Sequence, residues 1–487
     1  MHNIRCTASS SFDTDALLTE ASASSNKYER RMSALSAFGI YGAGPYLWQL
    51  TLLVDGGVAA DLGASPADMV LSRTAIFAAW GPGSVVLGSI ADKLGRKPTL
   101  LFSLALGVTS LVASANANDF GAFVSARALS GVALGGYEAV CFTLLVEGVT
   151  KSRASAAATA LNSLSALTIC SMVPFHIACT ELFDLGWREE LLAVGAYQAL
   201  ALGATALLAI ESPSFLAETG RQREAAAAIR RVAAINKADL SPAAEACLAG
   251  AEEERLVDAY QLSANGDAAA SDDVDADTTA MEALFGGGRW RSTLAISFGF
   301  VACVLNYYAL ACLSGGLSDA PNAIYVTLPL LALVDVPGYV LADWAARRAE
   351  DPDPPFSLRT ATSGALVLSG GLCLLIALVA VTSEGGVGGG GAAVALAVGA
   401  KLLVAAPFQT LYLLPILYYP ARFRGTGIGF CLTCGRLAST ASPFIAGTLP
   451  LQEVGLISAA VAFAAGAALA AAPPPPVRAT DSEATIR

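Results

Sequence analysis

Among the charged residues inside long apolar stretches of this sequence, five are candidates for a function: Arg127, Glu138, Asp335, Lys401 and Arg436. A charge at the centre of a lipid bilayer costs about 2.5–3.5 kcal/mol on insertion scales, so such side chains usually face an opposite charge or a water-filled cavity. Two interpretations follow. The residues bind a charged solute along an interior path, or they form static buried pairs. The sequence leaves both open at each position.

The spacing of Arg127 and Glu138 places them on one face of a helix. They are eleven residues apart, which is close to three α-helical turns or about 16 Å. Both would then line one side of a central path, with Glu138 as the group that titrates or faces a cation. Asp335 and Arg436 are expected to pair with each other. Lys401 holds the place in the second half of the chain that Arg127 holds in the first.

Aromatic and amide side chains accompany these charges. Asn306, Tyr307, Tyr308, Gln409 and Tyr412 occur in two of the apolar segments. Amphipathic rings with a few polar groups suit a pocket for a small molecule, whereas tyrosine is also common at membrane interfaces and in helix packing. Together with the five charged residues they form the predicted substrate-binding set. No catalytic residue is predicted.

Histidine and cysteine give no sign of a metal or redox centre. The chain has 2 His and 10 Cys, and Cys431 and Cys434 form a CxxC without a second pair or a nearby histidine. The cysteines are expected to be small buried apolar residues. His176, near the end of an apolar segment, is interpreted as an interfacial residue, with titration near neutral pH as the alternative. No metal and no cofactor are predicted.

The composition indicates a membrane protein. Of 487 residues, 55% are hydrophobic and 14% are charged, whereas soluble domains carry about 25% charged residues. An ordinary soluble enzyme is excluded, and the net charge of −11 argues against nucleic acid, which binds basic surfaces. Twelve apolar segments are each long enough to cross a bilayer. They are 34–54, 69–90, 98–116, 121–144, 156–179, 190–210, 293–313, 322–342, 361–382, 392–418, 426–446 and 454–472.

The loop charges orient the chain. With the N-terminus inside, Lys and Arg gather in the inner loops and Asp and Glu in the outer ones, as the positive-inside rule requires. Both termini are then cytosolic. The expected regions are a cytosolic tail (1–32), a six-helix bundle (33–210), a cytosolic linker (211–291), a second six-helix bundle (292–473) and a cytosolic C-terminal tail (474–487).

The linker is expected to have two parts. Phe215 to Asn236 is predicted to be helical, and the acidic stretch around 264–280 is predicted to be mobile, because its composition cannot bury a core. That stretch is interpreted as a solvated connection, with a docking site for a basic partner as the alternative.

A charged turn motif occurs once in each half. The first copy spans 88–97 after the second apolar segment, and a weaker copy spans 343–348 after the eighth. In the first copy Gly95 permits a tight turn, Asp92 is placed to accept hydrogen bonds at a helix N-terminus, and the two basic residues face the anionic inner leaflet. The predicted conformational latch comprises Gly88, Asp92, Gly95, Arg96, Lys97, Arg153, Asp343, Arg347, Arg348 and Arg424.

The repeat predicts specific contacts. Because both copies have the same orientation, the halves are expected to be related by an axis along the membrane normal. Asp92 should lie near the start of the eleventh helix (425–426) and within reach of Arg153, and Asp343 should lie near Arg424 and the start of the fifth helix.

The first copy resembles the signature loop of the major facilitator superfamily. Arg127-x3-Gly131-x3-Gly135 is similar to a second motif of that superfamily, and Glu211-Ser-Pro213 resembles a stretch of its sugar-porter and organic-ion branches. Further positions look most like the synaptic-vesicle-2-related branch. They include Leu284-Phe285, Asn306-Tyr307-Tyr308, Val336-Pro337-Gly338, Phe408-Gln409, Tyr412, Tyr419-Pro420, Arg424, Arg436 and Pro443-Phe444. The resemblance implies an all-α membrane fold of twelve transmembrane helices in two pseudo-symmetric six-helix bundles.

The same resemblance implies a secondary active or facilitative transporter that moves a small organic solute by alternating access. Its partners would be the solute and the lipid bilayer. A coupling proton is left open, because the stretch that matches the branch's acidic first helix is 44–47, which has no acidic residue. A membrane sensor or scaffold with the same fold is the alternative. No catalytic constellation and no G-x4-G-K-[ST] loop is present, so neither an enzyme nor ATP-driven pumping is expected.

Overall fold

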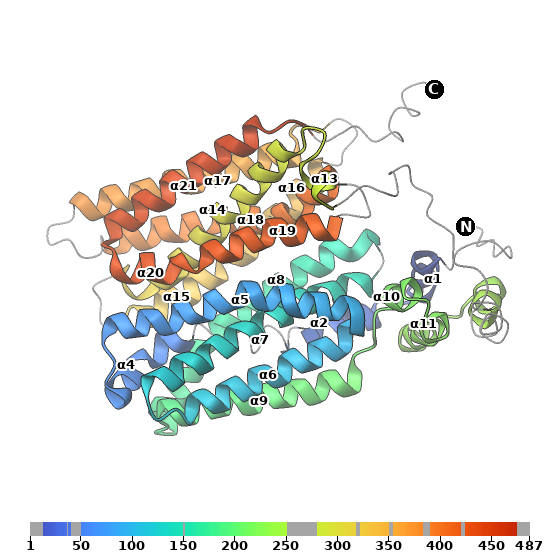
Figure 1. Ribbon diagram of the computed structural model, residues 1–487, viewed down its shortest axis with the longest axis horizontal. Coiled ribbons are helices and arrows are strands. Elements are labelled where there is room, and N and C mark those ends of the chain that lie inside the picture. The colour runs from blue at the N-terminus through green and yellow to red at the C-terminus, as the bar shows by residue number, and fades with distance from the viewer. Residues whose placement is uncertain are drawn as a thin grey trace.

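The computed structural model describes residues 13–36, 38–39, 50–149, 151–250, 280–317, 322–349, 354–382, 390–419 and 424–474. Over these ranges the chain forms helices and no strand. Long helices form two bundles that lie side by side (Figure 1). The first bundle contains α4 (Leu50–Leu62), α5 (Pro66–Leu94), α6 (Arg96–Ala115), α7 (Phe120–Glu147), α8 (Lys151–Ile177) and α9 (Trp187–Leu208). The second contains α14 (Trp290–Cys312), α15 (Ile324–Leu333), α16 (Asp335–Ala349), α17 (Leu358–Thr382), α18 (Gly390–Tyr418), α19 (Arg424–Ser439), α20 (Ala441–Thr448) and α21 (Leu451–Ala471).

The long helices agree with the expected spans. Ten described segments are long and apolar enough to cross a membrane. The eleventh expected span, 426–446, is divided between α19 and α20, and much of the first, 34–54, lies outside the described residues. The predicted all-α membrane fold is confirmed.

Two glycines bring α7 close to α5. A Cβ atom at Gly131 would collide with the carbonyl of Ile76, and one at Gly135 would collide with the carbonyl of Trp80. Small residues allow membrane helices to approach this closely. The R-x3-G-x3-G motif is therefore a packing motif in this chain, and it holds Trp80 beside the α7 residue Glu138.

The turn between α5 and α6 depends on Gly95. Its φ of +116° lies in a region that residues with a Cβ atom rarely adopt. A Cβ atom here would also collide with the carboxylate of Glu211. Gly95→Ala is therefore expected to destabilise the protein by about 2 kcal/mol or more, measured as a lower thermal unfolding temperature in detergent.

Gly88→Ala is the matched control for that change. Gly88 lies within α5, and a Cβ atom there would have no neighbour within 4 Å. Because alanine favours helix over glycine by about 1 kcal/mol, this variant should be neutral or more stable. Equal losses at both positions would contradict the strain assigned to Gly95.

Short helices form a cap at one end of the first bundle, and this end is called the linker end below (Figure 1). The cap contains α1 (Thr14–Ala21), α2 (Lys27–Ser36), α10 (Pro213–Glu218) and α11 (Gln222–Asn236). Asn236 ties these segments together. Its Oδ1 accepts a hydrogen bond of 2.8 Å from the backbone N–H of Tyr28, and its Nδ2 donates one of 3.0 Å to the carbonyl of Ala21.

The cap also has an apolar core. Leu17 and Leu18 of α1 and Ile229 and Val232 of α11 are all at most 2% exposed. The sequence predicted the helical linker but not that the preceding tail would pack against it. The acidic stretch around 264–280 lies outside the described residues, apart from its last residue.

The two bundles meet along two pairs of helices. α19 and α20 pack against α5, and α15 and α16 pack against α8. Hydrogen bonds cross this boundary: Nε2 of Gln409 donates to Oγ1 of Thr159 over 2.7 Å, and Sγ of Cys170 lies 3.3 Å from the carbonyl oxygen of Pro329. The eighth span is interrupted at its middle, because α15 ends at Leu333 and α16 begins at Asp335.

Candidate functional site

An ion pair joins the two bundles. Nη2 of Arg436 (α19) lies 2.5 Å from both carboxylate oxygens of Glu138 (α7). Nη1 of Arg436 donates a hydrogen bond of 2.8 Å to the hydroxyl of Tyr308 (α14). Nε1 of Trp80 (α5) donates one of 3.0 Å to Oε2 of Glu138. These four residues are called the central cluster below.

Aromatic rings enclose the pair. The guanidinium carbon of Arg436 lies 4.3 Å from the centroid of the Trp80 ring, a cation–π distance. Phe77 packs edge to face against Tyr308 with the ring centroids 4.9 Å apart. Because the side chain of Arg436 is 1% exposed and that of Glu138 is 24% exposed, Glu138 is the member of the pair that the surroundings still reach.

The expected pair of Asp335 and Arg436 is wrong. Arg436 pairs across the two bundles with Glu138, and Asp335 pairs within the second bundle with Lys401. Sequence spacing could not decide this, because all four residues lie on different helices.

Asp335, Lys401 and Tyr307 form a second group, called the inner cluster below. Oδ2 of Asp335 accepts a hydrogen bond of 2.6 Å from the Tyr307 hydroxyl and lies 3.3 Å from Nζ of Lys401. The same ammonium lies 2.7 Å from the centroid of the Tyr307 ring. Asp335 is 1% exposed and Lys401 is 2% exposed. Within the part of the chain that the structure describes, Oδ1 of Asp335 has no hydrogen-bond partner.

Of the other residues of the predicted binding set, Tyr412 lies near Glu138, Arg436 and Tyr308, whereas Arg127 and Asn306 make their contacts elsewhere. Arg127 donates hydrogen bonds of 3.0 and 2.5 Å to Oγ of Ser114 on the neighbouring α6. Nδ2 of Asn306 donates to the carbonyl of Ser458, at 3.0 Å, in the packing of α14 against α21. Tyr412 stacks on Phe142 of the first bundle, with centroids 5.9 Å apart. Gln409, described above, also contacts the first bundle.

Trp80 of the central cluster and its neighbour Phe77 were not among the residues predicted from the sequence. Trp80 and Phe77 lie in an apolar helix among many other hydrophobic residues, and a search for charges passes over them. The sequence offers only indirect evidence for Trp80: the glycine motif of α7 predicts a close helix neighbour, and Trp80 lies on that neighbour opposite Gly135.

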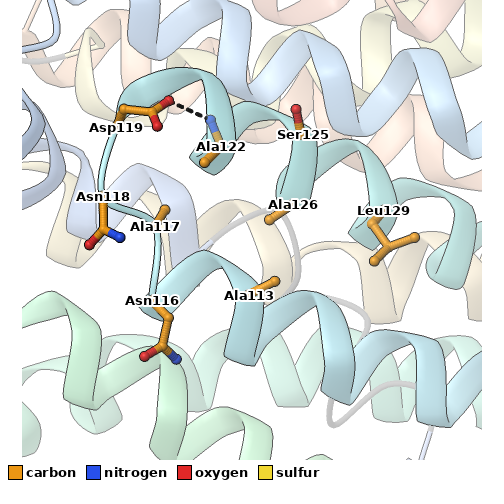
Figure 2. A pocket seen from close by; sticks show the side chains of 9 residues that line it. All are labelled: Ala113, Asn116, Ala117, Asn118, Asp119, Ala122, Ser125, Ala126 and Leu129. Carbon is orange, nitrogen blue, oxygen red and sulfur yellow. Dashed lines mark hydrogen bonds between the residues drawn. The ribbon is translucent and has the colours of Figure 1, made fainter.

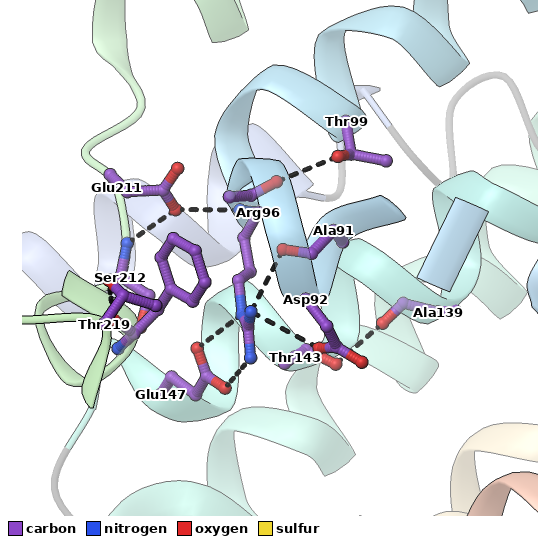
Figure 3. A network of polar contacts seen from close by, with 12 residues as sticks. Ala91, Asp92, Arg96, Thr99, Ala139, Thr143, Glu147, Glu211, Ser212 and Thr219 are labelled. Carbon is purple, nitrogen blue, oxygen red and sulfur yellow. Dashed lines mark hydrogen bonds and ion pairs between the residues drawn. The ribbon is translucent and has the colours of Figure 1, made fainter. Parts of the chain in front are cut away.

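The first turn motif forms a polar network at the linker end (Figure 3). Nε and Nη2 of Arg96 donate to the two carboxylate oxygens of Glu147 over 3.1 and 3.0 Å. Its guanidinium lies 3.4 Å from the carboxylate of Asp92 and 4.4 Å from the ring centroid of Phe215. Because Arg96 is 8% exposed, the prediction that it faces the lipid headgroups is wrong.

Glu211 has the role that was predicted for Asp92. Its carboxylate accepts hydrogen bonds from the backbone N–H groups of Arg96 and Lys97, at 3.1 to 3.2 Å, at the start of α6. A negative charge is favourable at a helix N-terminus. Nζ of Lys97 donates to the carbonyl of Ala209 over 2.7 Å rather than facing lipid. The Glu211-Ser-Pro213 motif, already noted in the sequence, is the feature that could have pointed to Glu211.

The rest of the predicted latch is described only in part. The side chains of Arg153, Arg424 and 425–426 lie outside the described residues, so the contacts expected for them stay predictions. In the second copy, Nη2 of Arg347 lies 2.8 Å from Oδ2 of Asp343, and Arg347 is 68% exposed.

Glu218 borders this network, and its protonation is expected to affect stability. Partial burial, together with the negative charge of Glu147, raises the pKa of the Glu218 carboxyl above its ordinary value. A carboxyl whose pKa is raised by folding stabilises the fold at low pH, and this contribution is lost as the pH rises through the folded-state pKa. Glu218→Gln should therefore raise the unfolding temperature by about 1–2 °C at neutral pH.

The same variant should have no effect at about pH 4, where an ordinary carboxyl is already largely protonated. Asp239→Asn, at an exposed position of the linker, is the control and should change little at either pH. A lower unfolding temperature for Glu218→Gln at neutral pH would show that its charge is favourable in the fold.

His176 is buried against the carboxylate of Glu190, which differs from the interfacial position expected for it. Its Nδ1 lies 3.0 Å from both carboxylate oxygens of Glu190, and the two residues are 6% and 0% exposed. Its ring lies 5.9 Å from that of Tyr325 in the second bundle. The partner could not be identified from spacing, because it belongs to the next helix.

A surface hollow of about 450 Å³ lies where α6 turns into α7, away from the linker end (Figure 2). Asp119 caps α7 here by accepting a hydrogen bond of 2.8 Å from the backbone N–H of Ala122. None of the predicted binding residues lines this hollow. The hollow is thus separate from both clusters.

Two helical bundles that meet at a buried ion pair, in a chain of this apolarity, define a multi-pass membrane protein. The family model described as the Major Facilitator Superfamily matches residues 32–443. The chain therefore belongs to the major facilitator superfamily, whose members are transporters rather than enzymes.

Curated relatives are similar over most of this chain. Solute carrier family 22 member 15 of Xenopus tropicalis is 29% identical over 79% of the chain and 65% of its own length. Solute carrier family 22 member 6 of Bos taurus is 27% identical over 80% of the chain and 64% of its own length. Organic cation/carnitine transporter 2 of Mus musculus is 27% identical over 74% of the chain and 58% of its own length. The match thus spans less than two thirds of each of these three relatives. The expected synaptic-vesicle-2-related or sugar-porter branch is not supported by them.

Proposed function

We propose that this chain is an alternating-access transporter of a small charged organic solute, which binds at the central cluster between the two bundles. The observation that carries the proposal is the ion pair of Glu138 and Arg436. Each bundle contributes one charge to it, so a solute that engages either charge changes the contact between the bundles.

The central cluster offers complementary partners for both signs of charge. Glu138 would face a cationic group and Arg436 an anionic group, with Trp80 and Tyr308 supplying aromatic faces. A solute with both charges would replace the ion pair without leaving either member unpaired, which avoids the penalty of an isolated buried charge. The relative named organic cation/carnitine transporter 2 supports the organic-ion branch for this chain.

Rocking of the two bundles would open the site to each side in turn. The linker end, with its cap, would be cytosolic, because the positive-inside rule places the basic loops there. On this assignment the network around Arg96 and the contacts at the start of α6 belong to the cytosolic gate. The ten buried or half-buried binding candidates would divide into residues that contact solute and residues that support them.

The test is uptake into proteoliposomes that contain the full chain. Three probes separate the charge requirements: carnitine carries both charges, choline carries the positive charge and butyrate carries the negative charge. Carnitine is expected to be taken up fastest. Uptake of choline alone or butyrate alone would assign the site to one sign of charge.

Two further measurements decide between mechanisms. Repeating the uptake with an imposed pH gradient tests for a coupling proton, and an unchanged initial rate would favour a facilitator. Binding of a probe, seen as a higher unfolding temperature, without uptake of any probe would favour the sensor or scaffold. If none of the three probes bound to the protein and none was taken up, the proposed substrate class would be wrong.

A further inference from the structure

The inner cluster is too deeply buried to act as a second docking point for solute in this structure. Asp335 and Lys401 are at most 2% exposed, and their ionic partners are each other. Both were predicted to bind substrate. Their position instead suggests that they act on another residue.

We propose that Lys401 is a positioning residue which, through Asp335 and Tyr307, holds Tyr308 against Arg436 and thereby sets how tightly the central cluster binds its solute. This inference rests on the proposed function for its effect on transport. Its structural part, the control of Tyr308 by Lys401, stands independently of which solute is carried.

The first step of the argument is that Lys401 fixes the ring of Tyr307. The ammonium lies on one face of this ring, and the Tyr307 hydroxyl donates 2.6 Å to the same Asp335 oxygen that Lys401 approaches. Phe408 packs at a centroid distance of 4.9 Å. The ring is thus held by a cation, a carboxylate and a second ring, and the loss of the cation weakens two of these contacts.

The second step is the link between the two clusters. Tyr307 and Tyr308 are consecutive on α14, so their side chains point about 100° apart around the helix. Tyr307 points into its own bundle, and Tyr308 reaches Arg436 and Trp80. The two tyrosine rings also touch edge to face, with centroids 5.2 Å apart. A shift of one ring therefore displaces the other.

The third step concerns the interruption of the eighth span. Asp335 is the first residue of α16, directly after the break. Its carboxylate connects this break to α14 and α18, and α15 and α16 form part of the contact with the first bundle. The inner cluster therefore joins the helix interruption to the ring that faces the solute site.

Trp80 supplies a readout that a general loss of packing would not imitate. It is one of 5 tryptophans, and its ring contacts Arg436 and Tyr308. In a chain with the other tryptophans replaced by phenylalanine, the emission of Trp80 reports on the central cluster alone. Lys401→Met should shift this emission in the same direction as Tyr308→Phe, although the partners of Lys401 lie within the second bundle.

Transport supplies the second readout. For carnitine, Lys401→Met should raise KM about tenfold with kcat changed less than twofold, because a residue along a coupling network typically changes binding by this order. Lys401→Arg keeps the cation and should restore most of the affinity. Glu453→Gln, an exposed charge of the same bundle, should leave both readouts unchanged.

A second variant covers the case in which Lys401→Met does not fold. Tyr307→Phe keeps the ring and removes only the bond to Asp335, and it should shift the Trp80 emission in the same direction. Unchanged emission in both variants would overturn the inference. A shifted emission without uptake of any probe would leave the positioning role intact and count against the proposed function instead.

Discussion

Arg436→Met is expected to lower the initial rate of solute uptake by about 100-fold. Removing one member of a buried, hydrogen-bonded charge pair costs about 2–5 kcal/mol in binding, and about 2.8 kcal/mol corresponds to a factor of 100. The variant also removes the contacts of the guanidinium with Tyr308 and Trp80. The measurement is uptake by proteoliposomes. Arg436→Lys is the variant that keeps the positive charge but loses the two guanidinium nitrogens that bond to Tyr308 and Glu138.

The two members of this pair should differ in their effect on stability. Glu138→Leu leaves Arg436, which is 1% exposed, as a buried charge without its carboxylate, whereas Arg436→Met leaves Glu138, which is 24% exposed and within reach of water. Breaking a buried pair costs about 3–5 kcal/mol, so Glu138→Leu should lower the unfolding temperature more.

The double variant separates folding from transport. Glu138→Leu combined with Arg436→Met removes both charges, and it should recover most of the stability but none of the uptake. Recovery of uptake in the double variant would show that the pair is only a structural contact. Normal uptake in either single variant would contradict its place in the binding site.

Arg96→Met is expected to lower the stability of the chain by about 3 kcal/mol, the lower end of the cost of breaking a buried ion pair. The guanidinium makes two hydrogen bonds to Glu147, approaches Asp92 and lies over the ring of Phe215. Without it, the carboxylates of Glu147 and Asp92 lose their shared cation. Thermal unfolding in detergent measures the loss.

The second copy of the motif supplies the matched control. Arg347 also pairs with a carboxylate, that of Asp343, but it is 68% exposed. Exposed ion pairs contribute about 0–1 kcal/mol, so Arg347→Met should change the unfolding temperature little. If both arginine variants were equally destabilising, burial would not explain the difference between the two copies.

The helices could be predicted from the sequence because their signal is local. Each span is a continuous apolar run, and Gly95 marks a turn by its own backbone freedom. The partners of the charged residues could not be predicted in this way. Glu138 and Arg436 are 298 residues apart, and no periodicity relates them.

The same limit applies at the linker end. The basic residues of the first motif were expected to face lipid, because such loops border the inner leaflet. The guanidinium of Arg96 is held by Glu147 at the end of α7, and its backbone N–H is held by Glu211 after α9. Only the fold brings these two carboxylates to the turn. Similarly, the sequence does not show what the amino-terminal tail packs against, and only the fold places its apolar residues on those of α11.

The cap has a consequence for synthesis of the chain. Ser25 and Tyr28 bond to Asn236, which follows them by 211 and 208 residues. At a translation rate of about 5–20 residues per second, these contacts cannot form until about 10–40 s after the first helices leave the ribosome. During that interval α1 lacks its partner α11, so the long helices of the first bundle are synthesised before their amino-terminal segment can complete the cap.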